Sequence, residues 1–171
     1  MPAANDWCLG RVAAPSIGAD QYAEIAISSV AGLGAHDGGP CVRINSTTDG
    51  DCYLLDLDDG TPDVQLYRAD DTGSLGFSAI GAAFGINPNA GDVWKLEISG
   101  TTFTVYKGGV SQGTRSDSTL STGQPGFFAN CGATFTNYQF DNFNSGDLGG
   151  ASTTAPPPWP PAYRLQPLLG R

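Results

Sequence analysis

Apolar and polar residues alternate along much of this chain, most clearly over residues 91–106. There Trp94, Leu96 and Ile98 occupy every second position, and the residues between them are polar. A period of two residues predicts a strand with one buried and one wet face. Residues 99–101 (Ser-Gly-Thr) supply a tight turn, after which the alternation resumes. This segment therefore predicts a β-hairpin with an apolar inner face.

The same alternation predicts further strands over residues 21–30, 41–45, 52–58 and 64–68, with Asp- and Gly-rich turns between several of them. No window of ten or more residues shows helical periodicity, and Glu, Lys and Met are scarce. Short strands separated by turn signals are typical of sandwiches. We therefore expect an all-β fold, a two-sheet antiparallel sandwich.

The chain divides into three parts by composition. Residues 1–20 form an irregular N-terminal segment, residues 21–147 one domain, and residues 148–171 a Gly- and Pro-rich linker with an extended tail. Proline favours an extended conformation that loses little entropy on docking. The tail also carries apolar residues that would suit an interface, namely Trp159, Tyr163, Leu165, Leu168 and Leu169. We expect the tail to dock on a neighbouring subunit.

The order of segments resembles a known family. A GDVWKLEISG strand, a TVYKGG strand, a GQPGFF segment and a final FDNF strand follow one another over residues 91–143, and QYAE stands at residues 21–24. This order resembles the concanavalin A-like lectin/glucanase (LamG-like) jelly roll over roughly residues 20–147. The resemblance implies a jelly-roll sandwich of the kind that phage and bacterial surface proteins contain.

Two departures from this family bear on function. Only the irregular residues 1–20 stand where the family has its opening strand, which predicts an open sheet edge. The E-x-D-x-E catalytic strand of the glucanase members is missing as well. Glycoside hydrolysis needs two carboxyls across the scissile bond, and the only glutamates, Glu24 and Glu97, lie in different strands. The one histidine, His36, lies in a loop. We therefore predict no catalytic residues and no enzymatic activity.

Calcium is the metal that the composition favours, because it prefers carboxylate and carbonyl oxygens. Aspartates concentrate between residues 49 and 71, and the candidate ligands are Asp56, Asp58, Asp59 and Asp63. The alternative is that these aspartates stabilise turns. Asp56 and Asp58 also share a strand face and could act as a carboxyl pair in glycoside hydrolysis, the alternative being a solvated face that leads into an acidic turn. No other cofactor is indicated.

Charge and cysteine content narrow the class of partners. The net charge of −9 excludes a basic footprint for nucleic acid. No apolar run approaches the ~20 residues of a membrane span, and no signal peptide is visible. The four cysteines are Cys8, Cys41, Cys52 and Cys131. They are either buried free thiols or include one disulfide.

Glycan binding would use exposed aromatic rings together with polar groups. The candidate rings are Tyr53, Tyr67, Trp94, Tyr106 and Tyr138, and the alternation places Trp94 in the core. The sequence alone does not choose among the others.

Three hypotheses on function follow. The first is a non-enzymatic structural or adhesive subunit of a virion, either a phage capsid decoration or a tail-associated protein. It would form a homo-oligomer or attach to other subunits through residues 156–171, and lysis would release it without an export signal. The second is a glycan-binding module of a secreted or cell-surface protein. The third is a glycoside-active enzyme. All three place the protein on a virion or outside the cell.

Overall fold

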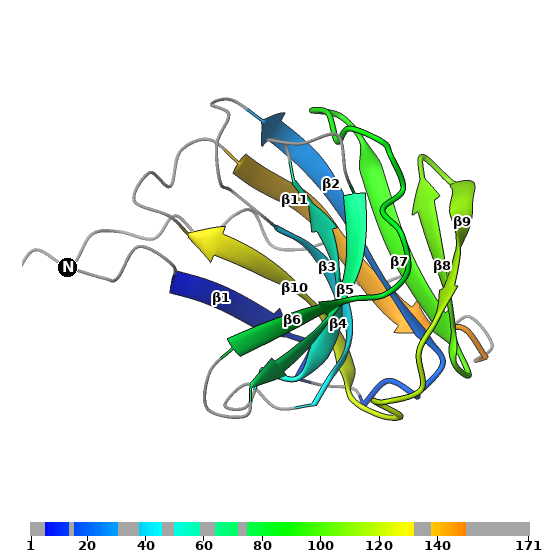
Figure 1. The fold of residues 1–171 in the computed structure, drawn as a ribbon. Coiled ribbons are helices and arrows are strands. Elements are labelled where there is room, and N and C mark those ends of the chain that lie inside the picture. Colours follow the sequence, from blue (N-terminus) through cyan, green and yellow to red (C-terminus); the bar gives the residue numbers. More distant parts are fainter. Residues whose placement is uncertain are drawn as a thin grey trace, which may run out of the picture.

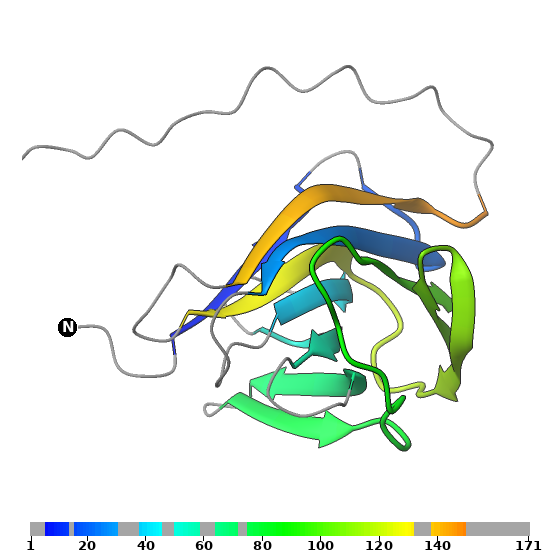
Figure 2. The ribbon, with the colours of Figure 1, turned by 90° about the horizontal axis from the view of Figure 1, so that it is seen from above.

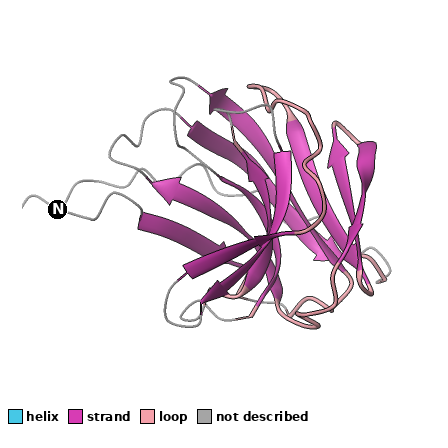
Figure 3. Ribbon diagram, in the orientation of Figure 1, coloured by secondary structure: helices cyan, strands magenta, loops and turns pink. Residues whose placement is uncertain are grey.

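The computed structural model describes residues 6–13, 16–30, 38–45, 50–58, 64–71, 75–131 and 138–149. Within these residues the chain forms strands and no helix (Figure 3), and so no helix in them is able to cross a membrane. The strands are β1 (Asp6–Arg11), β2 (Gln21–Val30), β3 (Gly38–Ile44), β4 (Cys52–Leu57), β5 (Val64–Asp71), β6 (Leu75–Ala79), β7 (Val93–Ser99), β8 (Thr102–Lys107), β9 (Val110–Ser116), β10 (Gln124–Cys131) and β11 (Tyr138–Asp147).

The strands form two antiparallel sheets that pack face to face (Figure 1). One sheet has six strands in the order β1-β10-β3-β4-β5-β6, and the other has five in the order β11-β2-β7-β8-β9. Seen from above, β2 and β11 lie on one side of the molecule and β3 to β6 on the other (Figure 2). The predicted all-β, two-sheet antiparallel sandwich is confirmed.

The main core lies between the sheets and consists of the apolar residues of the alternating pattern. On β7 the side chains of Trp94, Leu96 and Ile98 are fully buried, and on β8 those of Phe103 and Val105 are buried as well. Each such side chain contributes on the order of 1.5–3 kcal/mol by leaving water. The predicted turn between these strands is present, with Gly100 at φ 58°, a left-handed conformation that glycine adopts without a steric penalty.

A second apolar cluster lies on the opposite face of the six-stranded sheet and includes Cys41, Cys52 and Leu54. Cys41 and Cys52 are buried free thiols. Burial, together with the neighbouring Cys52, raises the pKa of the Cys41 thiol well above its usual value. The prediction of buried free thiols is confirmed for this pair. The side chains of Cys8 and Cys131 lie outside the described residues.

The N-terminal segment differs from the prediction. Asp6–Arg11 forms β1, which pairs with β10 along its whole length, from Asp6 opposite Cys131 to Arg11 opposite Gly126. The expectation of an irregular segment that leaves an open edge is therefore wrong for these residues. Their sequence, DWCLGR, shows little alternation, and the strand is recognised by its backbone pairing to β10.

Candidate functional site

The fold decides which aromatic rings are available to a ligand. Trp94 and Tyr53 are fully buried in the main core. The hydroxyl of Tyr53 donates a hydrogen bond to Asp117 Oδ1 at 2.6 Å. The side chain of Tyr138 lies outside the described residues. Tyr67 and Tyr106 remain from the candidates of the sequence, and both are half-buried.

Polar and aromatic side chains gather on the outer face of the five-stranded sheet. Strand register places Tyr22 opposite Glu97, Glu24 opposite Lys95, and Lys95 opposite Tyr106. All five alternate with buried core residues, and so they share the outer face of β2, β7 and β8. We name these five residues the tyrosine–lysine patch.

Lys95 lies at the centre of this patch. Its Nζ donates a hydrogen bond to Glu97 Oε1 at 2.6 Å. The same ammonium lies 4.4 Å from the centroid of the Tyr106 ring and 5.8 Å from that of the Tyr22 ring. Cation–π contacts of this kind contribute about 0.5–1 kcal/mol at exposed sites. Lys95 is therefore held between two tyrosine rings with one carboxylate beside it.

The electrostatics of the patch favour a charged Lys95 and a neutral Tyr106. Partial burial lowers the pKa of Lys95, but the hydrogen bond and charge of Glu97 outweigh it, so that the pKa is raised overall. A hydrogen bond to Glu97 is also the main cause of the raised pKa of the Tyr106 hydroxyl. The Lys95 ammonium and the Tyr106 hydroxyl thus both lie beside the Glu97 carboxyl.

Two glutamates that the sequence placed in separate strands are thereby neighbours on one face. Glu24 and Glu97 lie on β2 and β7, which are paired. Lys95 lies beside both of them, opposite Glu24 in the strand register and 2.6 Å from Glu97 Oε1. The patch thus brings together groups that are able to donate hydrogen bonds to a ligand and to accept them.

The outer face of the six-stranded sheet carries a different aromatic pair. Tyr67 and Phe77 meet edge to face with their centroids 6.2 Å apart. Phe77 is 38% exposed. Their surroundings are largely apolar, with Tyr67 packed on the cluster of Cys41 and Leu54. A sugar is rich in hydroxyls and needs polar partners, which the tyrosine–lysine patch supplies more fully.

Of the predicted calcium ligands, Asp56 and Asp58 are half-buried, Asp56 on β4 and Asp58 just after it. Asp59 and Asp63 lie outside the described residues, and so the four-residue site is not tested. In the described part of the chain, no three acidic, histidine or cysteine side chains gather as a metal site would require. The predicted interface residues Trp159, Tyr163, Leu165, Leu168 and Leu169 also lie outside the description, as does His36.

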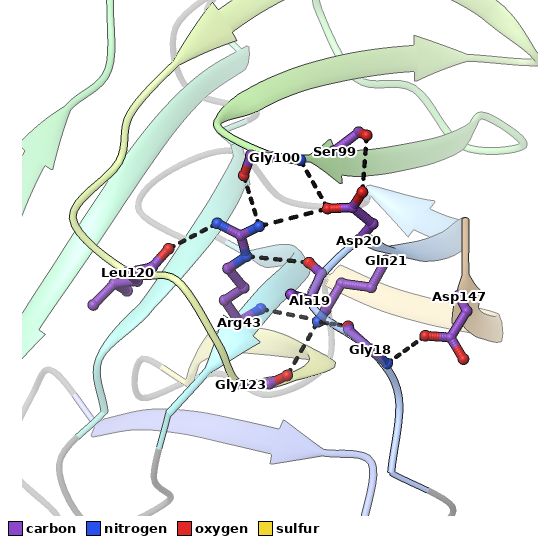
Figure 4. A network of polar contacts seen from close by, with 10 residues as sticks. All are labelled: Gly18, Ala19, Asp20, Gln21, Arg43, Ser99, Gly100, Leu120, Gly123 and Asp147. Carbon is purple, nitrogen blue, oxygen red and sulfur yellow. Dashed lines mark hydrogen bonds and ion pairs between the residues drawn. The ribbon is translucent and has the colours of Figure 1, made fainter. Parts of the chain in front are cut away.

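A buried polar network closes one end of the sandwich (Figure 4). The guanidinium of Arg43 donates to the carbonyl oxygens of Ala19, Leu120 and Gly100 at 3.2, 2.8 and 2.7 Å. Arg43 is 3% exposed and has a left-handed backbone, with φ 53°. Its backbone N–H donates to Gln21 Oε1 at 3.1 Å.

Acidic side chains complete the network at its rim. Asp20 accepts hydrogen bonds from the Gly100 backbone N–H at 2.7 Å and the Ser99 hydroxyl at 3.1 Å. These bonds lower the pKa of Asp20, with a smaller contribution from Arg43. Asp147 on β11 accepts a hydrogen bond from the Gly18 backbone N–H. Because protein groups engage the charged atoms throughout, the network stabilises the fold rather than offering a ligand site.

The sequence matches no protein-family model and no curated protein. Solved structures are similar, however. The carbohydrate-binding module CBM66 from Bacillus subtilis superposes with a TM-score of 0.62 at 18% identity, over 86% of this chain and 84% of that one. The chain has the concanavalin A-like lectin/glucanase fold. The fold is shared with sheep galectin-11 in complex with glycerol, at a TM-score of 0.51 and 9% identity over 85% and 99% of the two chains.

CG-16, a homodimeric agglutinin from chicken liver, shares the concanavalin A-like fold as well, at a TM-score of 0.51 and 9% identity over 82% of this chain and 99% of that one. Identities this low support the architecture and leave the ligand to be argued from the site. The jelly-roll resemblance seen in the sequence is thus confirmed at the level of fold.

Sequence reasoning found parts of the tyrosine–lysine patch but not its assembly. Alternation placed Lys95 and Glu97 on the wet face of their strand. It gave no sign that β2 lies beside β7, and so Tyr22 and Glu24 were not linked to them. The order of strands in the concanavalin A-like fold is the signal that would have joined these residues.

Proposed function

We propose that this protein is a non-enzymatic carbohydrate-binding module that holds a glycan against the tyrosine–lysine patch. The observation that carries the proposal is the position of Lys95, which pairs with Glu97 at 2.6 Å between the rings of Tyr22 and Tyr106. Aromatic faces suit the C–H bonds of a sugar ring, because the ring quadrupole is negative on its face. The ammonium and carboxylate donate to and accept from hydroxyls.

The structural neighbours support the same class of function. One is a carbohydrate-binding module and another an agglutinin by name, so the glycan-binding hypothesis has more support than the virion subunit. The virion hypothesis depends on residues 156–171, which lie outside the described chain.

The test is binding of the full chain to a panel of neutral and charged oligosaccharides by isothermal titration calorimetry. We expect Tyr22→Ala and Lys95→Met to weaken binding at least about tenfold, which corresponds to ~1.4 kcal/mol. Phe77→Ala, on the other sheet, serves as the matched control and should bind as the wild type does. If Phe77→Ala weakens binding while Tyr22→Ala and Lys95→Met bind as the wild type does, the site lies on the six-stranded sheet instead.

The absence of cleavage is checked on the same mixtures. We expect no new reducing ends after prolonged incubation with any ligand that binds. Release of sugar that Glu97→Gln abolishes would instead support the enzyme hypothesis. A wild-type protein that binds none of the glycans at millimolar concentration would contradict the proposed function.

A further inference from the structure

We infer that the ligand of the tyrosine–lysine patch is an uncharged sugar whose ring lies on Tyr22, and that Gly146 is the positioning residue for this ring. The inference rests on the proposed function and adds the class of ligand and a residue outside the patch. Three observations carry it: the space over Gly146, the different surroundings of the two tyrosines, and the charges around Lys95.

Gly146 leaves room for the Tyr22 side chain on β11. The two residues are opposite each other in the pairing of β2 with β11. A Cβ on Gly146 would lie 2.9 Å from Cε1 and 3.3 Å from the hydroxyl oxygen of Tyr22. The tyrosine ring therefore occupies the space that a side chain at this position would fill. The end of the Tyr22 ring thus lies against β11 at Gly146.

The two tyrosines differ in their distance from Lys95. The Lys95 ammonium lies over both rings, 4.4 Å from the Tyr106 centroid and 5.8 Å from the Tyr22 centroid. Tyr106 thus holds Lys95 more closely, and we place the sugar on Tyr22, the ring with the weaker cation–π contact. A sugar on Tyr22 has the Lys95–Glu97 pair beside it, where neighbouring hydroxyls are able to accept from one and donate to the other.

The charges of the patch disfavour an acidic sugar. The patch holds two carboxylates, Glu24 and Glu97, and one ammonium, Lys95, which Glu97 already binds at 2.6 Å. A sulfate or uronate group would compete with Glu97 for Lys95 while it approached both carboxylates. The chain as a whole carries a net charge of −9, which repels anionic polymers further. A neutral sugar meets none of these penalties.

The ligand class is tested with matched pairs of oligosaccharides. Neutral β-glucan, galactan and fructan chains are each compared with a sulfated derivative of the same length, by calorimetry with the full-length protein. We expect the neutral member of the bound pair to bind the wild type at least about tenfold more tightly than the sulfated member. In the double variant Glu24→Gln/Glu97→Gln, this difference in affinity should be smaller. Equal or tighter binding of the sulfated member would overturn the ligand class. No binding of any chain would overturn the proposed function itself.

Gly146 is tested against a matched glycine. Gly146→Ala should weaken binding at least about tenfold with the melting temperature little changed, since the clash involves the end of a flexible side chain. Gly149→Ala is the control, because a Cβ at that position meets nothing within 4 Å. Binding by Gly146→Ala equal to that of Gly149→Ala would overturn the positioning role.

A double-mutant cycle separates positioning from a general structural effect. If Gly146 acts through Tyr22, Gly146→Ala should cause no further loss of affinity in a Tyr22→Ala background. Full additivity of the two substitutions would mean that Gly146 acts by another route and would overturn its positioning role.

Discussion

The hydroxyl oxygen of Tyr53 lies 2.6 Å from Oδ1 of Asp117, and this bond ties the middle of the core to the segment that follows β9. The same hydroxyl accepts a hydrogen bond from the Leu120 backbone N–H at 2.8 Å. Asp117 also pairs with Arg68 at 3.0 Å. One buried tyrosine hydroxyl thus donates to one polar group of this segment and accepts from another.

Tyr53→Phe is expected to lower the free energy of unfolding by about 1–3 kcal/mol. The substitution keeps the ring but removes both hydrogen bonds, which leaves the partly buried Leu120 N–H without its acceptor. Urea unfolding measures the loss. Tyr22→Phe, on the outer face of the other sheet, should change stability by less than about 0.5 kcal/mol. Equal effects of the two substitutions would show that the Tyr53 hydroxyl contributes nothing specific.

Tyr53 also makes the fold sensitive to alkali. Burial and the hydrogen bond to Asp117 raise the pKa of Tyr53 to about 12, whereas an unfolded tyrosine ionises near pH 10. Since the folded pKa is the higher one, this contribution to stability is complete below about pH 10 and is lost as the pH rises toward about 12. Urea unfolding across this range should show the wild type losing more stability than Tyr53→Phe. Parallel curves would contradict the prediction.

Arg43→Met is expected to lower the free energy of unfolding by about 3 kcal/mol or more. Three carbonyl oxygens lose a charged donor, and the side chain that supplies it is almost fully buried. Arg43→Lys should lose less, because it keeps the charge but not the planar fork that reaches all three. Arg11→Met, at an exposed position, should stay within about 0.5 kcal/mol. Denaturant unfolding compares the three, and an Arg43→Met loss as small as that of Arg11→Met would count against the network.

Trp94→Ala tests the core between the sheets. The side chain is fully buried, so its removal should destabilise the fold by about 3–5 kcal/mol through lost burial and a cavity. Val93→Ala is the neighbouring control, since Val93 is 37% exposed and should lose under about 0.5 kcal/mol. Thermal unfolding of both proteins gives the comparison. A loss below about 1 kcal/mol for Trp94→Ala would mean that the core relaxes around the gap.

Alternation in the sequence predicted the strands that have one buried face, and it failed where a strand has none. The prediction over residues 21–30 coincides with β2, because Ile25 and Ile27 are buried at every second position. β9 (Val110–Ser116) was not predicted from the sequence, because this edge strand is largely exposed. It is defined by its backbone pairing to β8. Local periodicity carries no information on such pairing.

The candidate site was less predictable than the fold, for a related reason. A period of two residues tells which face a side chain takes, but not which strands are neighbours. Tyr22 and Lys95 meet only because β2 pairs with β7. Likewise, nothing local to Gly146 indicates that a ring from another strand lies over it.

Deletion of residues 156–171 tests the predicted docking tail. The described sandwich ends before this segment, and so the melting temperature should change by less than about 2 °C. If the tail docks on a neighbouring subunit, light scattering should show that the full chain self-associates and the shortened chain does not. Identical molar masses for the two chains would contradict a role of the tail in homo-oligomer formation.

Because β2 pairs with both β7 and β11, the surface beside Tyr22 is completed only when the last strand of the sandwich has been synthesised. A chain released early, before residue 146, has Tyr22 but not the strand surface on which its ring rests. An immobilised neutral glycan would therefore retain finished, correctly paired molecules and let truncated or misfolded products pass. Retention on such a column would serve as a purification step and as a conformational assay in the same experiment.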